Sequence, residues 1–206
     1  MAKDLMEMAK KIPSQGGREI GHYLRHVASH VSRECDIVEV GSWLGAGTAQ
    51  LCLGIQDGHN DCGLHIFDRF TVNKTEVKKA KIQGVKIKCG QDTLPIVQKY
   101  IQPFKVRHKF YKTNITSIKK YSGRPIGMYI DDAAKKEEQF EHVMKLFKHH
   151  FIPGVTILIL MDFFFFEWKG DDNYKYQFNY MQDNEEFEFI ERVLPDKSAA
   201  CYLYKG

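Results

Sequence analysis

The sequence contains no apolar run long enough to cross a membrane. A membrane-spanning helix needs about 20 consecutive apolar residues, whereas the longest run here, Val155 to Met161, has the length of a strand. The first dozen residues mix charged and apolar side chains, which suits an amphipathic helix and differs from the apolar core of a secretory signal. We therefore expect a cytoplasmic protein that does not bind membranes.

Cysteine pairs at metal-binding or redox spacing are also missing. The five cysteines are odd in number and scattered, and no two form a Cys-x-x-Cys pair. Neither a disulfide framework nor a zinc knuckle is therefore expected, and the thiols should be reduced.

Two nucleotide-binding signatures are absent as well. The sequence has neither the Gly-x-Gly-x-x-Gly pattern of dinucleotide-binding proteins nor the Gly-x-x-x-x-Gly-Lys-Ser/Thr pattern of phosphate-binding loops. Instead, residues 37–48 read Ile-Val-Glu-Val-Gly-Ser-Trp-Leu-Gly-Ala-Gly-Thr. β-Branched residues, then small residues, then an apolar stretch predict a strand, a tight turn and a helix. At such a turn, glycines let a ligand approach the backbone, and free amides at the helix start favour a polar or anionic group.

Strand and helix patterns alternate along the chain, which predicts a parallel sheet covered by helices. A helix is expected over residues 133–150, before the most apolar strand. The expected strands cover residues 37–40, 64–67, 106–111, 126–130 and 155–161, followed by a hairpin of 186–194 and 199–204. The fold class is therefore α/β, a doubly wound, mostly parallel seven-stranded sheet with a C-terminal antiparallel hairpin. At 206 residues and 43% hydrophobic content, we expect a single domain, with N-terminal helices in 1–34 and the core in 35–206.

Four of the predicted parallel strands carry a carboxylate at or near their ends: Glu39, Asp68, Asp131 and Asp162. The carboxyl ends of parallel strands meet along one edge of a sheet, which is where ligands bind. Asp68 follows the second strand, where a carboxylate in a doubly wound sheet holds a ribose diol. We therefore expect a ribose-containing ligand at this edge.

Two motifs resemble those of a known enzyme family. Residues 37–48 resemble the first motif of class I S-adenosylmethionine-dependent methyltransferases, in the variant whose middle glycine is replaced, here by Trp43. Phe67-Asp68-Arg69-Phe70 resembles the Asp-Ser-Phe element of the macrocin group of sugar O-methyltransferases. The resemblance implies a Rossmann-like methyltransferase fold that binds S-adenosylmethionine.

The resemblance also implies roles for individual residues. The motif residues should surround the methionine portion of the cofactor, Asp68 should hold the ribose, and Asn114 should lie near the adenine. The implied cofactor-binding residues are Glu39, Gly41, Ser42, Trp43, Gly45, Gly47, Asp68, Asn114 and Asp131.

A divalent cation is a further implication, because the sequence is similar to catechol O-methyltransferase-like enzymes. These commonly hold a cation through an acid after the fourth strand and an acidic or amide pair after the fifth. A hard cation prefers oxygen ligands and lowers the pKa of an acceptor hydroxyl. Asp131, Asp132 and Asp162 match part of that pattern, and Phe163 stands where the second member of the pair is expected. Magnesium bound by these three aspartates is therefore one hypothesis.

The competing hypothesis assigns the aspartates after the fourth strand to proton transfer. Asp131 or Asp132 would then be the catalytic residue, acting directly as general base. A third reading makes the pair merely the N-cap of the helix expected from Ala133.

Two further segments have unusual compositions. Between Lys74 and Arg124 the formal charge is +12, in a chain of net charge +4. This segment could steer an anionic substrate or contact nucleic acid, and a pair of solvated surface helices would explain it as well. The aromatic run Phe163 to Phe166 could wall an acceptor pocket, form a homo-oligomer interface or pack against the preceding helix. Residues 170–180, with three tyrosines, are expected to form an acceptor-side loop.

Together these patterns predict an S-adenosylmethionine-dependent methyltransferase. The favoured reaction is O-methylation of a small or sugar-like acceptor, anionic if the basic segment steers it. One alternative is a non-methylating relative of hydroxylase type on the same scaffold. Another is a degenerate binding module whose basic face contacts nucleic acid or a partner protein.

Overall fold

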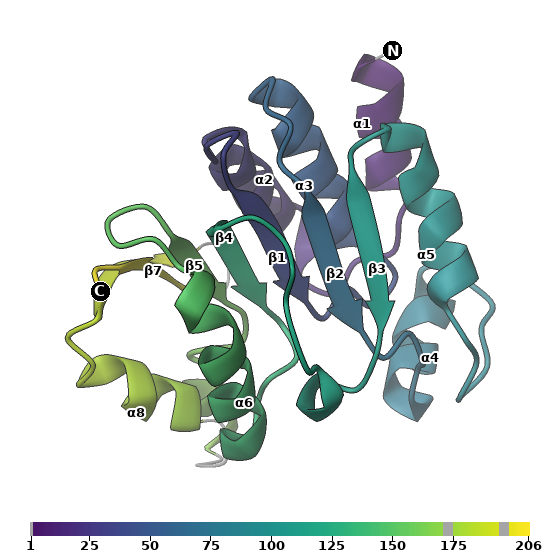
Figure 1. Cartoon of the computed structure of the whole chain (residues 1–206). Helices are drawn as coiled ribbons and strands as arrows, with labels where there is room; N and C mark the ends of the chain where they lie inside the picture. Colours follow the sequence, from purple (N-terminus) through teal and green to yellow (C-terminus); the bar gives the residue numbers. More distant parts are fainter. Residues whose placement is uncertain (1, 171–174, 194–197) are drawn as a thin grey trace.

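A single seven-stranded sheet forms the centre of the protein. The computed structural model describes residues 2–170, 175–193 and 198–206, and in it the strand order is β3-β2-β1-β4-β5-β7-β6 (Figure 1). Strands β1 to β5 run parallel, and β7 runs antiparallel to both β5 and β6. The fold class expected from the sequence is therefore confirmed. The strands are β1 (Asp36–Val40), β2 (Leu64–Asp68), β3 (His108–Lys112), β4 (Ile126–Asp131), β5 (Ile157–Leu160), β6 (Phe187–Val193) and β7 (Ala199–Tyr204).

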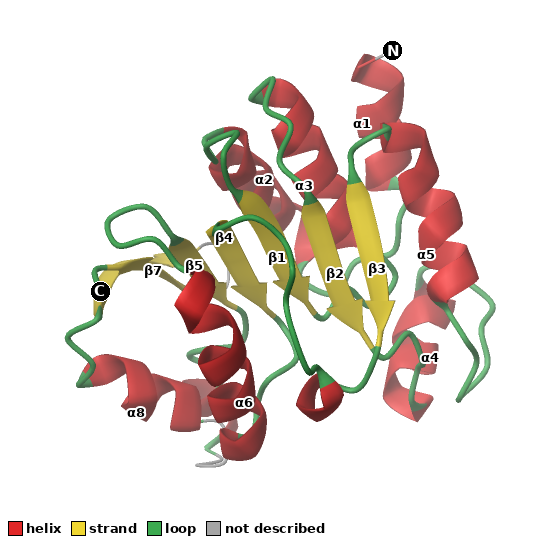
Figure 2. Cartoon of the chain, in the orientation of Figure 1, coloured by secondary structure: helices red, strands yellow, loops and turns green. Residues whose placement is uncertain are grey.

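Helices cover both faces of the sheet (Figure 2). They are α1 (Ala2–Lys10), α2 (Gly17–Ser29), α3 (Ala46–Asp57), α4 (Lys74–Ile82), α5 (Leu94–Ile101), α6 (Glu137–Phe147), α7 (Phe166–Lys169) and α8 (Tyr176–Gln182). Successive side chains of a strand point to opposite faces. Ile37 accordingly packs in the cluster with α1, α2, α3 and α5, and Val38 packs in the cluster with α6 and α8. None of the described helices combines the length and apolar character needed to cross a membrane.

The segment after β4 differs from the sequence prediction. The predicted helix from residue 133 was wrong at its start, because α6 begins at Glu137 and residues 132–136 form an irregular turn. The cause is Asp131, whose buried carboxylate accepts hydrogen bonds from the amides of Ala133 (2.9 Å) and Ala134 (2.7 Å). Such a side-chain bond to nearby amides offers the backbone an alternative to helix.

The aromatic run after β5, Phe163 to Phe166, lies partly in the core and partly at a cavity. Phe163 and Phe164 are buried, and Phe166 packs against Phe178 of α8. Phe165 lines a cavity described below. Most of the run therefore packs inside the protein, with ring contacts to α8, β6 and β7 rather than to the preceding helix that the sequence suggested. Of its members, Phe165 alone lines the cavity, as the acceptor-wall hypothesis requires.

The expected acceptor-side loop is in part helix. Tyr176 and Tyr180 belong to α8, and both rings pack against Phe140 of α6. Residues 171–174 lie outside the described residues.

Candidate functional site

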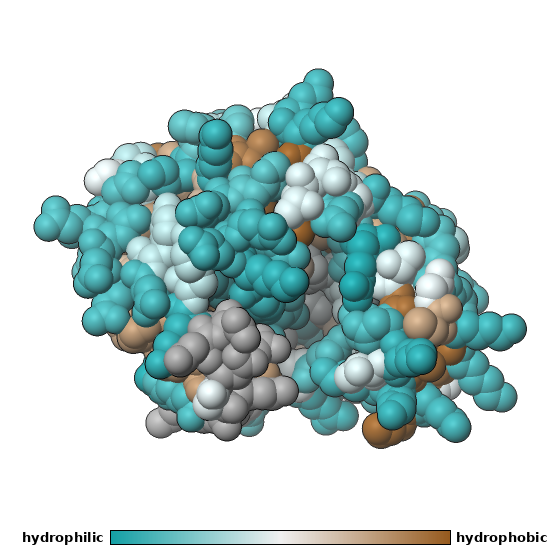
Figure 3. Space-filling model, turned by 90° about the horizontal axis from the view of Figure 1, so that it is seen from below, coloured by the Kyte–Doolittle hydropathy of each residue, from teal (hydrophilic) through white to brown (hydrophobic). Residues whose placement is uncertain are grey.

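The topology gathers the functional candidates at one edge of the sheet. The carboxyl ends of β1, β2, β4 and β5 lie along the lower edge in Figure 1. Strand β1 pairs with β2 on one side and with β4 on the other. The strand order therefore reverses next to β1, and the loops that leave the neighbouring strands lead to opposite faces of the sheet. A ligand-binding crevice forms at such a topological switch point. Figure 3 views the molecule from this side and shows a mostly hydrophilic face.

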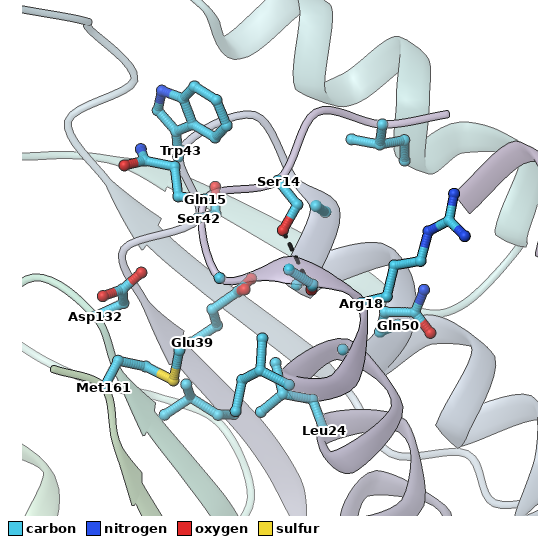
Figure 4. A pocket seen from close by; sticks show the side chains of 18 of the residues that line it. Ser14, Gln15, Arg18, Leu24, Glu39, Ser42, Trp43, Gln50, Asp132 and Met161 are labelled. Carbon is cyan, nitrogen blue, oxygen red and sulfur yellow. Dashed lines mark hydrogen bonds between the residues drawn. The ribbon is translucent and has the colours of Figure 1, made fainter. Parts of the chain in front are cut away.

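Two adjacent cavities occupy this edge. The larger, about 510 Å³, is lined among others by Asp68, Asn114, Asp162 and Phe165. The smaller, about 110 Å³, lies beneath the linker between α1 and α2 (Figure 4). Four residues line both cavities: Gln15, Gly41, Trp43 and Asp132. The combined space is in the range of small-molecule binding sites.

The turn after β1 brings the two cavities together. Gly41 has a φ of +92°, and a Cβ there would lie 3.0 Å from the backbone carbonyl carbon of Asp132 and 3.0 Å from the Cβ of Ala133. Only glycine allows the turn to pass this close to the end of β4. Trp43, the residue that replaces the middle glycine of the motif, also adopts a left-handed conformation, with a φ of 49°. The turn therefore keeps a glycine-like geometry without that glycine.

Asp68 connects the end of β2 to this turn. Its carboxylate accepts hydrogen bonds from the amides of Ser42 (2.7 Å) and Trp43 (3.0 Å), and from the amide of Phe70. Burial raises the pKa of Asp68, and these three amides oppose that rise. A carboxylate has roughly four acceptor directions, so about one is left for a ligand. The ribose diol expected from the sequence can therefore contribute one hydroxyl hydrogen bond to Asp68, not two.

Glu39 lies at the base of the smaller cavity. Its side chain is buried, and the Thr48 hydroxyl donates to it at 2.6 Å. Burial raises the pKa of Glu39 to about 8, so the carboxyl group is protonated at neutral pH. A Cβ on Gly47 would lie 2.9 Å from Glu39 Oε1, so only glycine fits there without displacing the carboxyl group.

Three buried polar atoms of residues at this cavity lack a partner. Among the described residues, Ser42 Oγ, Trp43 Nε1 and Gln50 Oε1 are buried without a hydrogen-bond partner, and all three residues line the smaller cavity. Buried polar atoms are nearly always hydrogen-bonded. A polar ligand group in this cavity could supply the missing partners.

The two adjacent aspartates after β4 lie in different environments. Asp131 was expected to contact cofactor or metal, or to act as base, but it lines neither cavity. Its fully buried carboxylate is occupied by the turn amides and by the Tyr129 hydroxyl at 3.2 Å. Asp132 lines both cavities, with 42% of its side chain exposed. Desolvation, together with the neighbouring Asp162 carboxylate, raises the pKa of Asp132 to about 6, against the opposing effect of the Lys135 ammonium.

The magnesium hypothesis does not fit these side chains. Within residues 2–170, 175–193 and 198–206, no group of three or more His, Cys, Asp or Glu is placed to hold a metal ion. Asp132 and Asp162 do approach each other, but the Lys135 ammonium lies 3.4 Å from the first carboxylate and 3.7 Å from the second. Asp131 points elsewhere, and Phe163 is a core residue.

Asn114 and two basic side chains complete the larger cavity. The Oδ1 atom of Asn114 accepts from the amide and hydroxyl of Thr116, both at 3.3 Å, so its NH₂ group is the part that could donate to a ligand. Arg69, which precedes α4, and Lys79 of α4 both line this cavity, and Lys79 belongs to the basic segment between Lys74 and Arg124. Arg69 pairs with Glu76 at 2.6 Å.

Sequence reasoning missed Lys135 and the linker between α1 and α2. The linker crosses to α4, where the Ser14 amide donates to Gln83 Oε1 (2.8 Å) and Gln83 Nε2 donates to the Ser14 carbonyl (2.9 Å). Gln15 follows and lines both cavities. No local sequence pattern indicates this contact, because Ser14 and Gln83 are 69 positions apart in the chain. Lys135 had one signal in the sequence, its position three residues after Asp132.

No family model and no curated protein matches the chain. Solved structures do match it. The O-methyltransferase NovP has a TM-score of 0.63 and 13% identity, over 92% of this chain and 81% of NovP. The SAH-bound methyltransferase PaMTH1 from Podospora anserina has a TM-score of 0.58 and 12% identity, over 98% of this chain and 88% of that one. An rRNA methylase from Streptococcus thermophilus has a TM-score of 0.54 and 12% identity, over 94% of this chain and 100% of that one. The chain therefore has the fold of class I S-adenosylmethionine-dependent methyltransferases.

Proposed function

We propose that this chain is an S-adenosylmethionine-dependent methyltransferase that methylates a hydroxyl group of a small acceptor. One observation carries the proposal: the glycine turn after β1, Asp68, Asn114 and Asp132 line the same cavity at the carboxyl edge of the sheet. Fold similarity to O-methyltransferases and to an SAH-bound methyltransferase supports it.

The cavities suit the two ends of the cofactor. In the larger one, Asp68 can accept one ribose hydroxyl, the Asn114 amide can donate to an adenine nitrogen, and Phe67 supplies an apolar wall. In the smaller one, Glu39, Ser42 Oγ and Gln50 Oε1 present oxygen atoms to an ammonium group. Two residues that the sequence predicts around the methionine portion, Glu39 and Ser42, therefore supply oxygen atoms at the smaller cavity.

Asp132 is placed to accept the proton that a hydroxyl acceptor must lose. S-Adenosylmethionine supplies, when bound, a methyl group on a positively charged sulfur, which the acceptor oxygen takes in an in-line displacement. Asp132 lies between the cavities, and its carboxylate is accessible. A base whose pKa lies near the working pH is effective in such a step. Lys135 holds that carboxylate in place through its ion pair.

The acceptor would lie in the part of the larger cavity beyond Asp132. Ile115, Ile118 and Phe165 give that part an apolar lining, and Gln139 adds a polar group. Arg69 and Lys79 at the same cavity would favour an acceptor with negative charge. These features suit a small ring-containing alcohol, including a sugar-like one.

An RNA acceptor is the second candidate, favoured by the +12 segment between Lys74 and Arg124. The two acceptor classes differ in salt dependence, because RNA binding releases counterions and weakens steeply with salt. RNA binding that falls by about a thousandfold between roughly 50 and 200 mM salt would favour this candidate. If RNA binding is undetectable at low salt, the small acceptor is favoured instead.

Calorimetric titration with S-adenosylmethionine tests the cofactor assignment. We expect saturable binding, and a loss of about tenfold to a hundredfold in affinity in Asp68→Ala, because a hydrogen bond to a charged group contributes about 1.5–3 kcal/mol. Asp57→Ala is the matched control, since Asp57 pairs with Arg25 and lines neither cavity. Absence of binding to the unmodified chain, or equal losses in both variants, would contradict the assignment.

Cofactor affinity should rise with pH because of Glu39. Its raised pKa, about 8, means that the carboxyl group is neutral below that pH, whereas the cofactor ammonium is bound best by the carboxylate. Binding should therefore release a proton, and affinity should increase up to about tenfold per pH unit below the pKa of Glu39, until the cofactor ammonium itself begins to lose its proton at roughly pH 8. Titration in buffers of different ionisation enthalpy measures the released proton.

Glu39→Gln serves as the control for this pH effect. Glutamine keeps the shape and cannot ionise, so the variant should bind more weakly at high pH and show no proton release linked to this group. An unchanged pH profile in Glu39→Gln would place the ammonium elsewhere.

A further inference from the structure

A lysine ammonium lies between the two carboxylates at the acceptor side of the larger cavity. Lys135 Nζ is 3.4 Å from Asp132 Oδ1 and 3.7 Å from Asp162 Oδ2, and it donates to the carbonyl oxygen of Met161. The Lys135 side chain is 20% exposed, about half the exposed fraction of either carboxylate. The positive charge therefore lies deeper in the protein than the two negative charges it joins.

The backbone is shaped to make this arrangement. The turn that Asp131 holds through its carboxylate directs the chain back toward β5, and the Lys135 amide donates to the Ala133 carbonyl within it. On the other strand, Asp162 has a φ of 58°, a left-handed conformation that non-glycine residues seldom adopt. The turn held by Asp131 after β4 and the left-handed conformation of Asp162 after β5 together bring the three side chains close to one another.

We propose that Lys135 is the resident cation of this site and that it takes the place of the divalent metal which the resemblance implies between Asp132 and Asp162. The inference deepens the proposed function, on which its catalytic meaning rests. An ion between these carboxylates would lie within a few ångströms of the fixed ammonium, and like charges at that distance repel strongly. Among the residues that the structure describes, no third His, Cys, Asp or Glu compensates, since Phe163 and Asp131 belong to the core. Lys135 is accordingly a positioning residue: it fixes Asp132 beside the acceptor and neutralises part of the carboxylate charge.

Binding of Mn²⁺ measures this directly, without any methyl transfer. We would titrate the full chain with Mn²⁺ and follow the free ion by electron paramagnetic resonance, in the unmodified protein, Lys135→Met and Lys135→Arg. The unmodified protein and Lys135→Arg should bind no Mn²⁺ at Asp132 and Asp162. Lys135→Met, which keeps the length and removes the charge, should gain affinity by about tenfold or more. Lys135→Met/Asp162→Asn should lose that gain, because Asn tolerates the left-handed backbone and removes one carboxylate.

Three results would overturn the proposal. One is Mn²⁺ binding by the unmodified protein that disappears in Asp132→Asn. Another is a Lys135→Met variant, folded by circular dichroism, that gains no Mn²⁺ affinity, because the lysine would then not be what excludes the ion. The third is a gain in Lys135→Arg equal to that in Lys135→Met.

Titration with S-adenosylmethionine separates this inference from the proposed function. If the cofactor does not bind and the Mn²⁺ pattern holds, the proposed function fails and the internal cation stands. If the cofactor binds and the unmodified chain also takes up Mn²⁺ at Asp132, the proposed function stands and the internal cation fails.

Discussion

Gly41→Ala is expected to lower S-adenosylmethionine affinity by about tenfold to a hundredfold, the loss that follows when one hydrogen bond to a charged group, about 1.5–3 kcal/mol, is broken. The new methyl group would lie 3.0 Å from the backbone of Asp132, a contact that must push the turn and the end of β4 apart. The Ser42 and Trp43 amides would move away from Asp68 with the turn. Cofactor titration by calorimetry measures the loss.

Gly84→Ala is the matched control for backbone strain. Gly84 also has a positive φ, +80°, but a Cβ there meets nothing within 4 Å. Both variants should lose about 1 kcal/mol of folding free energy from the left-handed conformation, measured by urea unfolding. Gly41→Ala should in addition lose cofactor affinity, whereas Gly84→Ala should bind the cofactor as tightly as the unmodified chain. If the two variants bind the cofactor equally well, the close approach of the turn to β4 has no role in binding.

Asp132→Asn is expected to reduce methyl transfer by about a hundredfold to ten-thousandfold, the range that general bases contribute. Cofactor affinity should change little, because asparagine keeps the shape of the side chain that lines both cavities. The measurement is single-turnover transfer from labelled cofactor, using the acceptor that a screen of small alcohols and sugars identifies.

The neighbouring aspartate provides the contrast. Asp131→Ala should lower the free energy of unfolding by roughly 1–3 kcal/mol, because it leaves buried amides unsatisfied; these belong to Ala133 and Ala134. Folded Asp131→Ala should transfer methyl groups more slowly than the unmodified chain, because the turn that places Lys135 loosens, but faster than Asp132→Asn. If Asp131→Ala removed transfer from folded protein while Asp132→Asn did not, the base would be Asp131.

Much of the site could be predicted from strand periodicity alone. Alternating strands and helices place the ends of β1, β2, β4 and β5 on one edge, and the sequence puts carboxylates there. Strand periodicity does not separate the adjacent aspartates, because Tyr129 and Ile130 are both buried and Asp132 lies in the turn after β4. Asp131 differs through the hydrogen bonds of its carboxylate with the Tyr129 hydroxyl and two turn amides.

The position of Lys135 could not be predicted in this way. Its side chain depends on a turn that exists only because the Asp131 carboxylate bonds two amides, and the expected helix from residue 133 would have turned it elsewhere. Its partner depends on the left-handed conformation of Asp162, for which an apolar strand followed by aromatics gives no local signal. Both features arise from packing between distant segments.

The linker between α1 and α2 has a kinetic consequence. Two hydrogen bonds between the Ser14 backbone and the Gln83 side chain fasten it, and the linker lies over the smaller cavity. A covering segment delays arrival and departure of an occupant equally, so it lengthens residence time without changing equilibrium affinity. In the proposed enzyme, cofactor exchange would limit the turnover rate if this segment opened more slowly than the methyl group is transferred.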